Sequence, residues 1–233
     1  MTRTLGIIPA KASSHKNWRT LNGKSLVQIA LDHATNAKSL TDTVLCVDDP
    51  DILPGEVKAI PTYGDGTAYL WKPPGAIYRV TVHAGSYETP IDVIRAALHS
   101  PSTADEYDAI AYIQPTSPLR TSEDIDEAVG MLGKYTDSVI SVSQSDDLHP
   151  GHMYWVAAGV PVDPMREWGP RQTLPKAYYR NGAVYVAKIS VIRDGKLRGD
   201  WCKFYEMPRE RSINIDDEFD FRMAEWLTGN KQP

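Results

Sequence analysis

Three lysines lie in and just after a short polar loop near the start of the chain, and they are placed to bind phosphate groups. Lys11 and Lys16 belong to the loop, and Lys24 follows it. The loop residues 12–14 are small, so backbone N–H groups can approach oxygen atoms there. Cations and backbone donors neutralise the negative charge of phosphate groups. An ordinary solvated loop explains the same residues equally well, because the glycines of a stronger phosphate-binding loop are missing.

A cluster of acidic residues precedes the last apolar stretch of the chain. It comprises Asp216, Asp217, Glu218 and Asp220. Such a cluster is typical of the first turn of a helix, which acidic side chains stabilise through the helix dipole. Carboxylates are also the ligands that a hard divalent cation prefers. A second acidic pair, 48–49, precedes Pro50, where it can cap the turn or take a minor part in a site.

Apolar runs of strand length alternate with stretches of helical spacing, which predicts an α/β sandwich with a largely parallel sheet. We expect strands at 5–8, 43–47, 108–113, 138–142, 182–188 and 204–207, and helices at 26–34, 90–98, 122–132 and 219–227. The segment 54–86 is expected to hold one short strand within a long excursion, and 153–158 one strand of a protruding arm. Catalytic groups should lie at the carboxyl ends of the strands.

Composition bounds the classes of protein that the chain can represent. Its 233 residues suit one domain, 1–233, with an ordinary apolar core. The net charge of −5 argues against nucleic acid or an anionic membrane as the partner, since either would require a basic face. Two cysteines form neither a disulfide framework nor a zinc site. With no signal peptide and no apolar stretch of spanning length, we expect a cytoplasmic protein.

Several motifs occur in an order and spacing that resemble one enzyme family. They are Ile7–Lys11, Lys16–Asn17, Gly23–Lys24, Asp48–Asp49, Ile113–Arg120, Arg171–Gln172, Leu174–Pro175, Tyr179–Val186 and Pro208–Asp216, with Glu218, Asp220 and Phe221 just beyond. Together they are similar to the CMP-sialic acid synthetase and acylneuraminate cytidylyltransferase family, which includes relatives acting on pseudaminic, legionaminic and 3-deoxy-octulosonic acids. The most specific piece is Ile113 to Arg120.

The resemblance implies a three-layer α/β/α, Rossmann-like nucleotidyltransferase fold of GT-A-like type. Its sheet is expected to be mostly parallel, with a protruding dimerisation arm at approximately 144–180 that also carries part of the acceptor site. The implied reaction transfers CMP from CTP to a small acidic acceptor, an acidic sugar, and releases pyrophosphate. The resemblance further implies Mg²⁺ as the cofactor and a homodimer.

The resemblance also assigns roles to individual residues. The catalytic residues it implies are Lys11, Lys16 and Asp216. The nucleotide-binding residues are Ala10, Lys11, Asn17, Lys24 and Arg79. The acceptor-binding residues are Gln114, Arg171, Asn181 and Tyr185. The metal ligands are Asp216 and Asn214.

Two departures from the family pattern leave alternatives open. The phosphate loop, 11–16, is short and lacks paired glycines, and the family's closing Asp-x-Asp is Asn214-Ile215-Asp216 here. A cytidylyltransferase for a non-sugar acid such as a phosphonate remains an alternative, as does a weakened paralogue that only binds nucleotide. A GT-A-like glycosyltransferase would require a carboxylate pair for its nucleotide-sugar, which the segment 114–120 does not resemble.

Overall fold

A sheet of nine described strands forms the middle layer of the protein in the computed structural model, which describes residues 2–53, 57–60, 67–71, 80–84, 88–98, 106–145, 149–162 and 170–229. The strands are β1 (Thr4–Ala10), β4 (Asp42–Val47), β5 (Val57–Ile60), β6 (Thr67–Trp71), β7 (Val80–Ala84), β8 (Ala109–Tyr112), β9 (Ser138–Gln144), β12 (Tyr178–Lys188) and β13 (Cys202–Glu206). Their order across the sheet is β13-β9-β12-β8-β1-β4-β7-β6-β5.

The pairing of these strands gives a mixed sheet in which one direction dominates. β1 pairs in parallel with both β4 and β8, β4 with β7, and β9 with β13. Only β12 and β6, among the described strands of this sheet, run against the others. The prediction of a mostly parallel sheet is therefore confirmed, and the carboxyl ends of its central strands meet at one edge.

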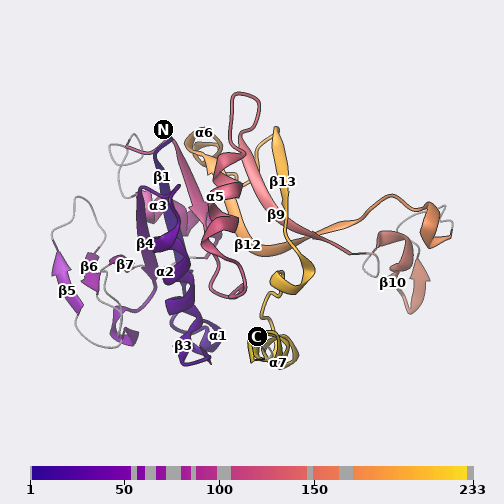
Figure 1. Cartoon of the computed structure of the whole chain (residues 1–233), viewed down its shortest axis with the longest axis horizontal. Helices are drawn as coiled ribbons and strands as arrows, with labels where there is room; N and C mark the ends of the chain where they lie inside the picture. The colour runs from indigo at the N-terminus through magenta and orange to yellow at the C-terminus, as the bar shows by residue number, and fades with distance from the viewer. Residues whose placement is uncertain are drawn as a thin grey trace.

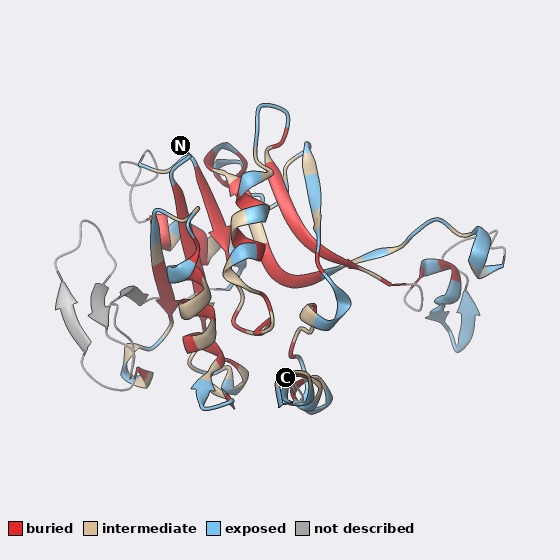
Figure 2. Ribbon diagram, viewed as in Figure 1, coloured by how far each residue is buried: buried red, intermediate tan, exposed pale blue. Residues whose placement is uncertain are grey.

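Helices cover both faces of the sheet. On one face α2 (Leu26–Asn36) and α5 (Ser122–Gly130) pack against residues such as Ile8, Val139 and Val184. On the other face α3 (Pro90–Leu98) and the short α6 (Ile189–Arg193) enclose a second core. Buried residues run along the central strands between these helices (Figure 2). The three-layer α/β/α expectation is confirmed.

Local sequence explains where the covering helices begin. The Ser25 side chain accepts a hydrogen bond from the backbone N–H of Gln28 at 3.2 Å and so caps α2. Thr121 caps α5 through a reciprocal pair of hydrogen bonds with Asp124. Apolar residues then recur at helical spacing on the face that each helix buries, as in Val27, Ala30 and Leu31 of α2.

Two expectations about elements were wrong. The segment 54–86 contains three described strands, β5, β6 and β7, where one was expected. These short runs show little alternation, so their pairing onto the edge of the sheet beyond β4 defines them rather than a local pattern. Helix α6 was not expected, because its five residues are too few to display a helical period.

An arm extends away from the sheet beyond β9 and β12 (Figure 1). It includes two 3₁₀ turns, Pro150–His152 and Arg171–Thr173, and an antiparallel hairpin of β10 (Trp155–Ala157) and β11 (Val160–Val162). The predicted single strand at 153–158 is therefore one half of a hairpin. Its side chains are exposed, and Trp155 retains 69% of its accessible surface. The arm exists as expected, while its role in dimer formation stays a prediction.

The last helix, α7 (Glu218–Gly229), packs beside the first loop of the chain. That loop contains α1 (His15–Trp18) and the small hairpin of β2 (Thr20–Leu21) and β3 (Lys24–Ser25). A separate apolar cluster joins the two regions through Leu21, Leu26, Ile215, Phe221 and Ala224. None of the helices in the described ranges has the length and apolarity that a membrane span requires.

The contact of α7 with the first loop predicts a large difference between two phenylalanines on this helix. Phe221 is 4% exposed within the cluster, whereas Phe219 is 70% exposed. Phe221→Ala should lower the free energy of unfolding by about 3 kcal/mol, because it removes buried apolar surface and leaves a cavity. Phe219→Ala, the matched control, should change it by less than about 0.5 kcal/mol. Urea unfolding measures both, and equal effects would contradict this packing.

Candidate active site

A cavity lies at the carboxyl ends of β1, β4 and β8. It brings together four residues expected in the site, which are Ala10, Lys11, Asn17 and Gln114. Other lining residues come from the start of α3 and from the strands, among them Thr89, Cys46 and Tyr112. Its volume of about 210 Å³ is below the range usual for ligand cavities, so it is suited to part of a ligand whose remainder extends along the neighbouring loop.

The loop after β1 is held in shape by contacts from two sides. Asp48, at the end of β4, accepts a hydrogen bond from the backbone N–H of Ala12 at 2.5 Å. The indole of Trp18 donates to the carbonyl of Lys11 at 3.2 Å, and the N–H of Ser14 donates to the same carbonyl. Asp48 thus positions the phosphate loop, a role that its place at a strand end signalled but that sequence reasoning did not assign.

The neighbouring Asp49 has the other role that the sequence left open for this pair. Its carboxylate accepts from the backbone N–H of Asp51 at 2.9 Å and caps the 3₁₀ turn Pro50–Ile52. The two adjacent aspartates therefore act on different segments.

The loop after β8, residues Gln114 to Arg120, is held from within by its own arginine. Arg120 is 1% exposed, and its Nη1 atom donates to the carbonyls of Gln114 at 2.6 Å and Ser117 at 2.7 Å. Burial lowers the pKa of Arg120, but the guanidinium stays protonated at neutral pH. This buried cation thus fixes the backbone on which Gln114 projects into the cavity.

The same loop is bonded to the segment that carries Asp216. The carbonyl of Thr116 accepts from the N–H of Ile215 at 2.7 Å, and the Thr116 hydroxyl donates to Oδ1 of Asn214 at 2.8 Å. The amide Nδ2 of Asn214 then donates to Oδ2 of Asp216 at 2.8 Å. Asn214 therefore turns its oxygen toward the loop and its nitrogen toward Asp216.

Asp216 also reaches the phosphate loop. Nζ of Lys16 lies 3.2 Å from Oδ1 of Asp216, so two residues expected to be catalytic meet from opposite ends of the chain. Beside them Arg19 pairs with Glu218 at 2.7 Å and stacks on the ring of Phe221, with 3.4 Å between its guanidinium carbon and the ring centroid. These contacts hold the start of α7 against the phosphate loop.

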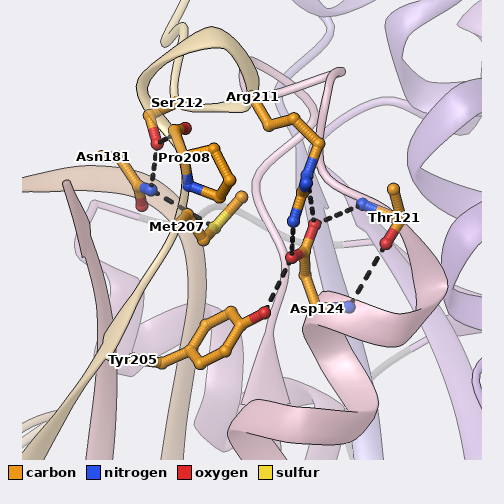
Figure 3. Close-up of polar contacts among 8 residues, drawn as sticks. All are labelled: Thr121, Asp124, Asn181, Tyr205, Met207, Pro208, Arg211 and Ser212. Carbon is orange, nitrogen blue, oxygen red and sulfur yellow. Dashed lines mark hydrogen bonds and ion pairs between the residues drawn. The ribbon is translucent and has the colours of Figure 1, made fainter.

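Asn181 does not have the orientation that a contact with the acceptor requires. It is 1% exposed, and its amide nitrogen donates to Ser212 Oγ at 2.9 Å and lies 3.2 Å from the sulfur of Met207 (Figure 3). Its oxygen accepts from Ser141 Oγ at 2.6 Å and from the N–H of Ala183. The side chain joins β9 and β12 to the segment 207–212, so its polar atoms are committed to the interior.

A buried aspartate anchors the same segment to α5 (Figure 3). Asp124 accepts from Arg211 at 2.6 Å, from the hydroxyl of Tyr205 at 2.8 Å and from the N–H of Thr121 at 2.8 Å. Burial opposes ionisation of Asp124, but these hydrogen bonds outweigh it and lower its pKa. The chain leading to Asp216 is thus fixed on two sides, by Asn181 and by Asp124.

The remaining expected residues lie apart from the cavity or outside the described structure. Lys24 pairs with Asp32 at 2.6 Å on the small hairpin and does not line the cavity, so its expected contact with the nucleotide is not supported. Tyr185 lines a second cavity on β12. Arg171 belongs to a 3₁₀ turn of the arm, but its side chain lies outside the described part. Arg79 also lies outside the described residues.

The acidic segment fits a metal ion only in part. Among the described residues, no group of three or more His, Cys, Asp or Glu side chains is arranged to hold one. Asp216 nevertheless offers a carboxylate that is 71% exposed, and Mg²⁺ is often bound by one or two carboxylates together with substrate phosphates. Asn214 directs its amide nitrogen at Asp216, so it is placed to orient that carboxylate rather than to be a ligand.

Solved structures share the fold of this chain. The 4-diphosphocytidyl-2C-methyl-D-erythritol synthase of Anaerococcus prevotii matches with a TM-score of 0.64 at 13% identity, covering 98% of this chain and 99% of that one. A CMP:2-keto-3-deoxy-manno-octonic acid synthetase complexed with CTP matches with a TM-score of 0.66 at 12% identity, covering 99% of this chain and 100% of the other. The fold is that of the α/β nucleotidyltransferases.

The curated proteins that the chain resembles include cytidylyltransferases. An N-acylneuraminate cytidylyltransferase of Escherichia coli is 28% identical over 235 residues, covering 96% of this chain and 51% of the relative. The post-translational flagellin modification protein B of Campylobacter coli is 23% identical, covering 95% and 92%. No family profile matches the chain. The chain is thus similar to N-acylneuraminate cytidylyltransferases, and it spans about half the length of the two curated enzymes of that name from Escherichia coli and Streptococcus agalactiae.

The buried surroundings of Arg120 predict a dependence of stability on pH. His33 of α2 lies near this guanidinium, and its Nδ1 has no hydrogen-bond partner among the described residues. Burial lowers the pKa of His33 to about 4, and the charge of Arg120 acts in the same direction. Between pH 6.5 and 4 the unfolded chain therefore takes up a proton that the folded protein excludes, so acidification should destabilise the fold.

Urea unfolding at pH 7 and pH 5 measures this effect. Between pH 7 and pH 5, the free energy of unfolding should fall by about 2 kcal/mol more in the wild-type protein than in His33→Gln. This is the value expected when a histidine stays neutral in the folded protein over roughly 1.5 pH units below 6.5, where it is protonated in the unfolded chain. His15→Gln, at an exposed histidine, is the matched control and should keep the wild-type dependence. If His33→Gln also keeps it, His33 is not the group responsible.

Proposed function

We propose that the protein is a cytidylyltransferase that transfers CMP from CTP to an acidic sugar and releases pyrophosphate. The observation that carries the proposal is the junction described above, where the cavity, the phosphate loop and Asp216 meet through the Gln114–Arg120 loop. Its relatives' names, which include N-acylneuraminate cytidylyltransferase, support CTP and an acidic sugar as the substrates.

The cavity is proposed to hold the cytidine part of CTP. Asn17 is nearly buried in its wall and offers both a donor and an acceptor, which suits the edge of a cytosine ring. Ala10 has a small side chain at the end of β1, so the ligand can approach the backbone there. From this position the phosphates would extend along the loop 11–16 toward the cations of Lys11 and Lys16.

In the proposed reaction a hydroxyl oxygen of the acceptor attacks the α-phosphorus of CTP. The new bond joins that oxygen to phosphorus, the bond from phosphorus to the β-phosphate bridging oxygen breaks, and the hydroxyl proton is lost to water. Lys11 and Lys16 neutralise the charge that grows on the departing pyrophosphate, so they stabilise the transition state more than the ground state. To reach the phosphates, the Lys16 ammonium leaves Asp216, to which it is paired without nucleotide.

Mg²⁺ is proposed as the cofactor, with Asp216 as its protein ligand. When bound, such an ion would polarise the phosphate oxygens and make the phosphorus more electrophilic. Asn214 holds the Asp216 carboxylate in place through its amide nitrogen. When the nucleotide binds, Lys16 would leave Oδ1 of Asp216 to contact a phosphate, and this carboxylate oxygen would become available to the ion.

The acceptor is proposed to lie on the other side of Gln114, toward β12 and the arm. Gln114 reaches the cavity, and a Cβ atom at Gly182 would come within 2.8 Å of its Oε1. Gly182, at φ +74, therefore gives Gln114 the room it occupies. Tyr185 lies nearby on the same strand, and Arg171 is proposed to supply a cation from the arm.

We further propose one domain over 1–233 and a homodimer formed through the exposed arm.

Two neighbouring aspartates test the assignment of Asp216. Asp216→Ala should reduce pyrophosphate release from CTP and acceptor by at least a hundredfold, because a bound Mg²⁺ would lose its proposed protein ligand. Asp217→Asn should keep at least a third of the wild-type rate, since its side chain only accepts a hydrogen bond from the N–H of Asp220 in the turn before α7. Near-parental turnover of Asp216→Ala at saturating Mg²⁺ would exclude it as the metal ligand.

The nucleotide is tested in the same assay. Pyrophosphate release should be fastest with CTP, because the donors and acceptors around Asn17 are proposed to read cytosine. Equal or faster rates with ATP or GTP across a panel of acidic sugars would contradict the proposed nucleotide.

A further inference from the structure

A second cavity lies on the same face of the sheet as the proposed nucleotide cavity. It encloses about 410 Å³, and its floor is formed by side chains of β9, β12 and β13, including Ile140, Tyr185 and Phe204. Two arginines, Arg180 and Arg198, complete its lining. Helices α3 and α6 cover this face of the sheet over β1, β4 and β8. Over β13 the face is not covered in this way, since Phe204 remains 54% exposed, so the cavity is open to solvent.

Two tyrosines separate this cavity from the nucleotide cavity. Tyr185 of β12 lies opposite Tyr112 of β8, and their rings meet edge to face with 6.5 Å between centroids. Tyr112 lines the nucleotide cavity and Tyr185 lines the second one. Arg180 precedes Tyr185 in β12 and lies opposite Val142 of β9. Because β12 is antiparallel to β8, Arg180 is displaced toward the carboxyl end of β8, where the proposed site lies. A ligand in the second cavity is thus beside the proposed nucleotide.

The charges of the two arginines are not compensated within the described part of the chain. Neither Arg180 nor Arg198 forms an ion pair with a described carboxylate, whereas Arg19, Arg211 and Arg222 each do. The protein as a whole carries a net charge of −5, so acidic side chains are not scarce. Both arginines are exposed, so their guanidinium groups are open to an anion from solvent, which could accept hydrogen bonds from both.

Arg180 interacts with Tyr185, which also lines this cavity. Burial raises the pKa of Tyr185, and the positive charge of Arg180 opposes that shift, so the two groups are close enough to interact. An aromatic and aliphatic floor suits a carbon skeleton, and guanidinium groups bind phosphate or carboxylate through paired hydrogen bonds.

We propose that this cavity binds a second anionic group, a phosphate, on the part of the acceptor acid that lies away from its attacking hydroxyl. A phosphate ester carries close to two negative charges at neutral pH and three acceptor oxygens, which match two guanidinium groups better than one carboxylate does. The proposal rests on the proposed function and makes it more specific: the acceptor is a phosphorylated acidic sugar rather than one with a single acid group.

Matched acceptors test this directly in the pyrophosphate-release assay with CTP. The pairs are 2-keto-3-deoxy-octonic acid with its terminal phosphate ester, and N-acetylneuraminic acid with its terminal phosphate ester. In at least one pair the ester should have a kcat/KM at least tenfold higher than the parent acid. Arg180→Gln and Arg198→Gln should each remove most of this preference, because losing one hydrogen bond to a charged group costs about tenfold or more in affinity.

Lys203→Gln is the control, because it removes a positive charge from β13 on the face opposite to Phe204. It should keep the wild-type preference. No preference for either ester in the wild-type protein would overturn the proposal, as would a preference that both arginine variants retain. Unfolding midpoints of the variants establish that they are folded.

Calorimetry without CTP separates this proposal from the proposed function. If no acceptor supports turnover but the wild-type protein binds an ester at least tenfold more tightly than its parent acid, and either arginine variant loses that difference, the phosphate site stands and the activity fails. If the parent acids are turned over and the esters have no advantage, the proposed activity stands and the phosphate site fails. Equal binding of ester and parent acid by the wild-type protein overturns the phosphate site.

Discussion

The segment from Gln114 to Arg120 joins the parts of the site that would otherwise be independent. Below it, the buried Arg120 binds the carbonyls of Gln114 and Ser117. Above it, Thr116 bonds the backbone of Ile215 and the side chain of Asn214. Only the Nη1 atom of Arg120 has hydrogen-bond acceptors among the described residues, and both acceptors are carbonyls of this loop. Another shape of the loop would leave the buried guanidinium without them, which is costly for a charged group. The positions of Gln114 and Asp216 therefore depend on one buried cation.

This constraint places the two ends of the chain in one site. Lys16 follows the first strand and Asp216 precedes the last helix, and they meet at 3.2 Å because the Gln114–Arg120 loop and the segment 205–212 fix the approach of α7. An exposed ion pair of this kind contributes at most about 1 kcal/mol. It is thus weak enough to be exchanged for phosphate and metal contacts, which suits a pair that must separate whenever the proposed nucleotide binds.

Sequence reasoning succeeded where a local signal coincided with a tertiary requirement. The apolar strands, the capped helices α2 and α5 and the strand-end loops follow from periodicity and position, and so the sheet and the edge at which these loops gather were predictable. Orientation was not. Asn181 and Asn214 stand in a motif of the expected pattern, yet the burial of the first and the direction of the second's amide are set by partners such as Ser212 and Thr116 that are distant in sequence.

The same limit explains Lys24 and Arg180. Lys24 follows the phosphate loop in the sequence and so suggests a triphosphate contact, but in the fold it pairs with Asp32. Arg180 shows no sign of a role in the sequence, because Arg198, which lines the same cavity, is distant along the chain. The assignment of nucleotide and acceptor to opposite sides of Gln114 is tested most directly by a crystal structure of the protein with CTP. The account predicts the cytidine between Asn17 and Gln114 with its phosphates along residues 11–16. A nucleotide bound instead in the cavity of Arg180 and Tyr185 would contradict it.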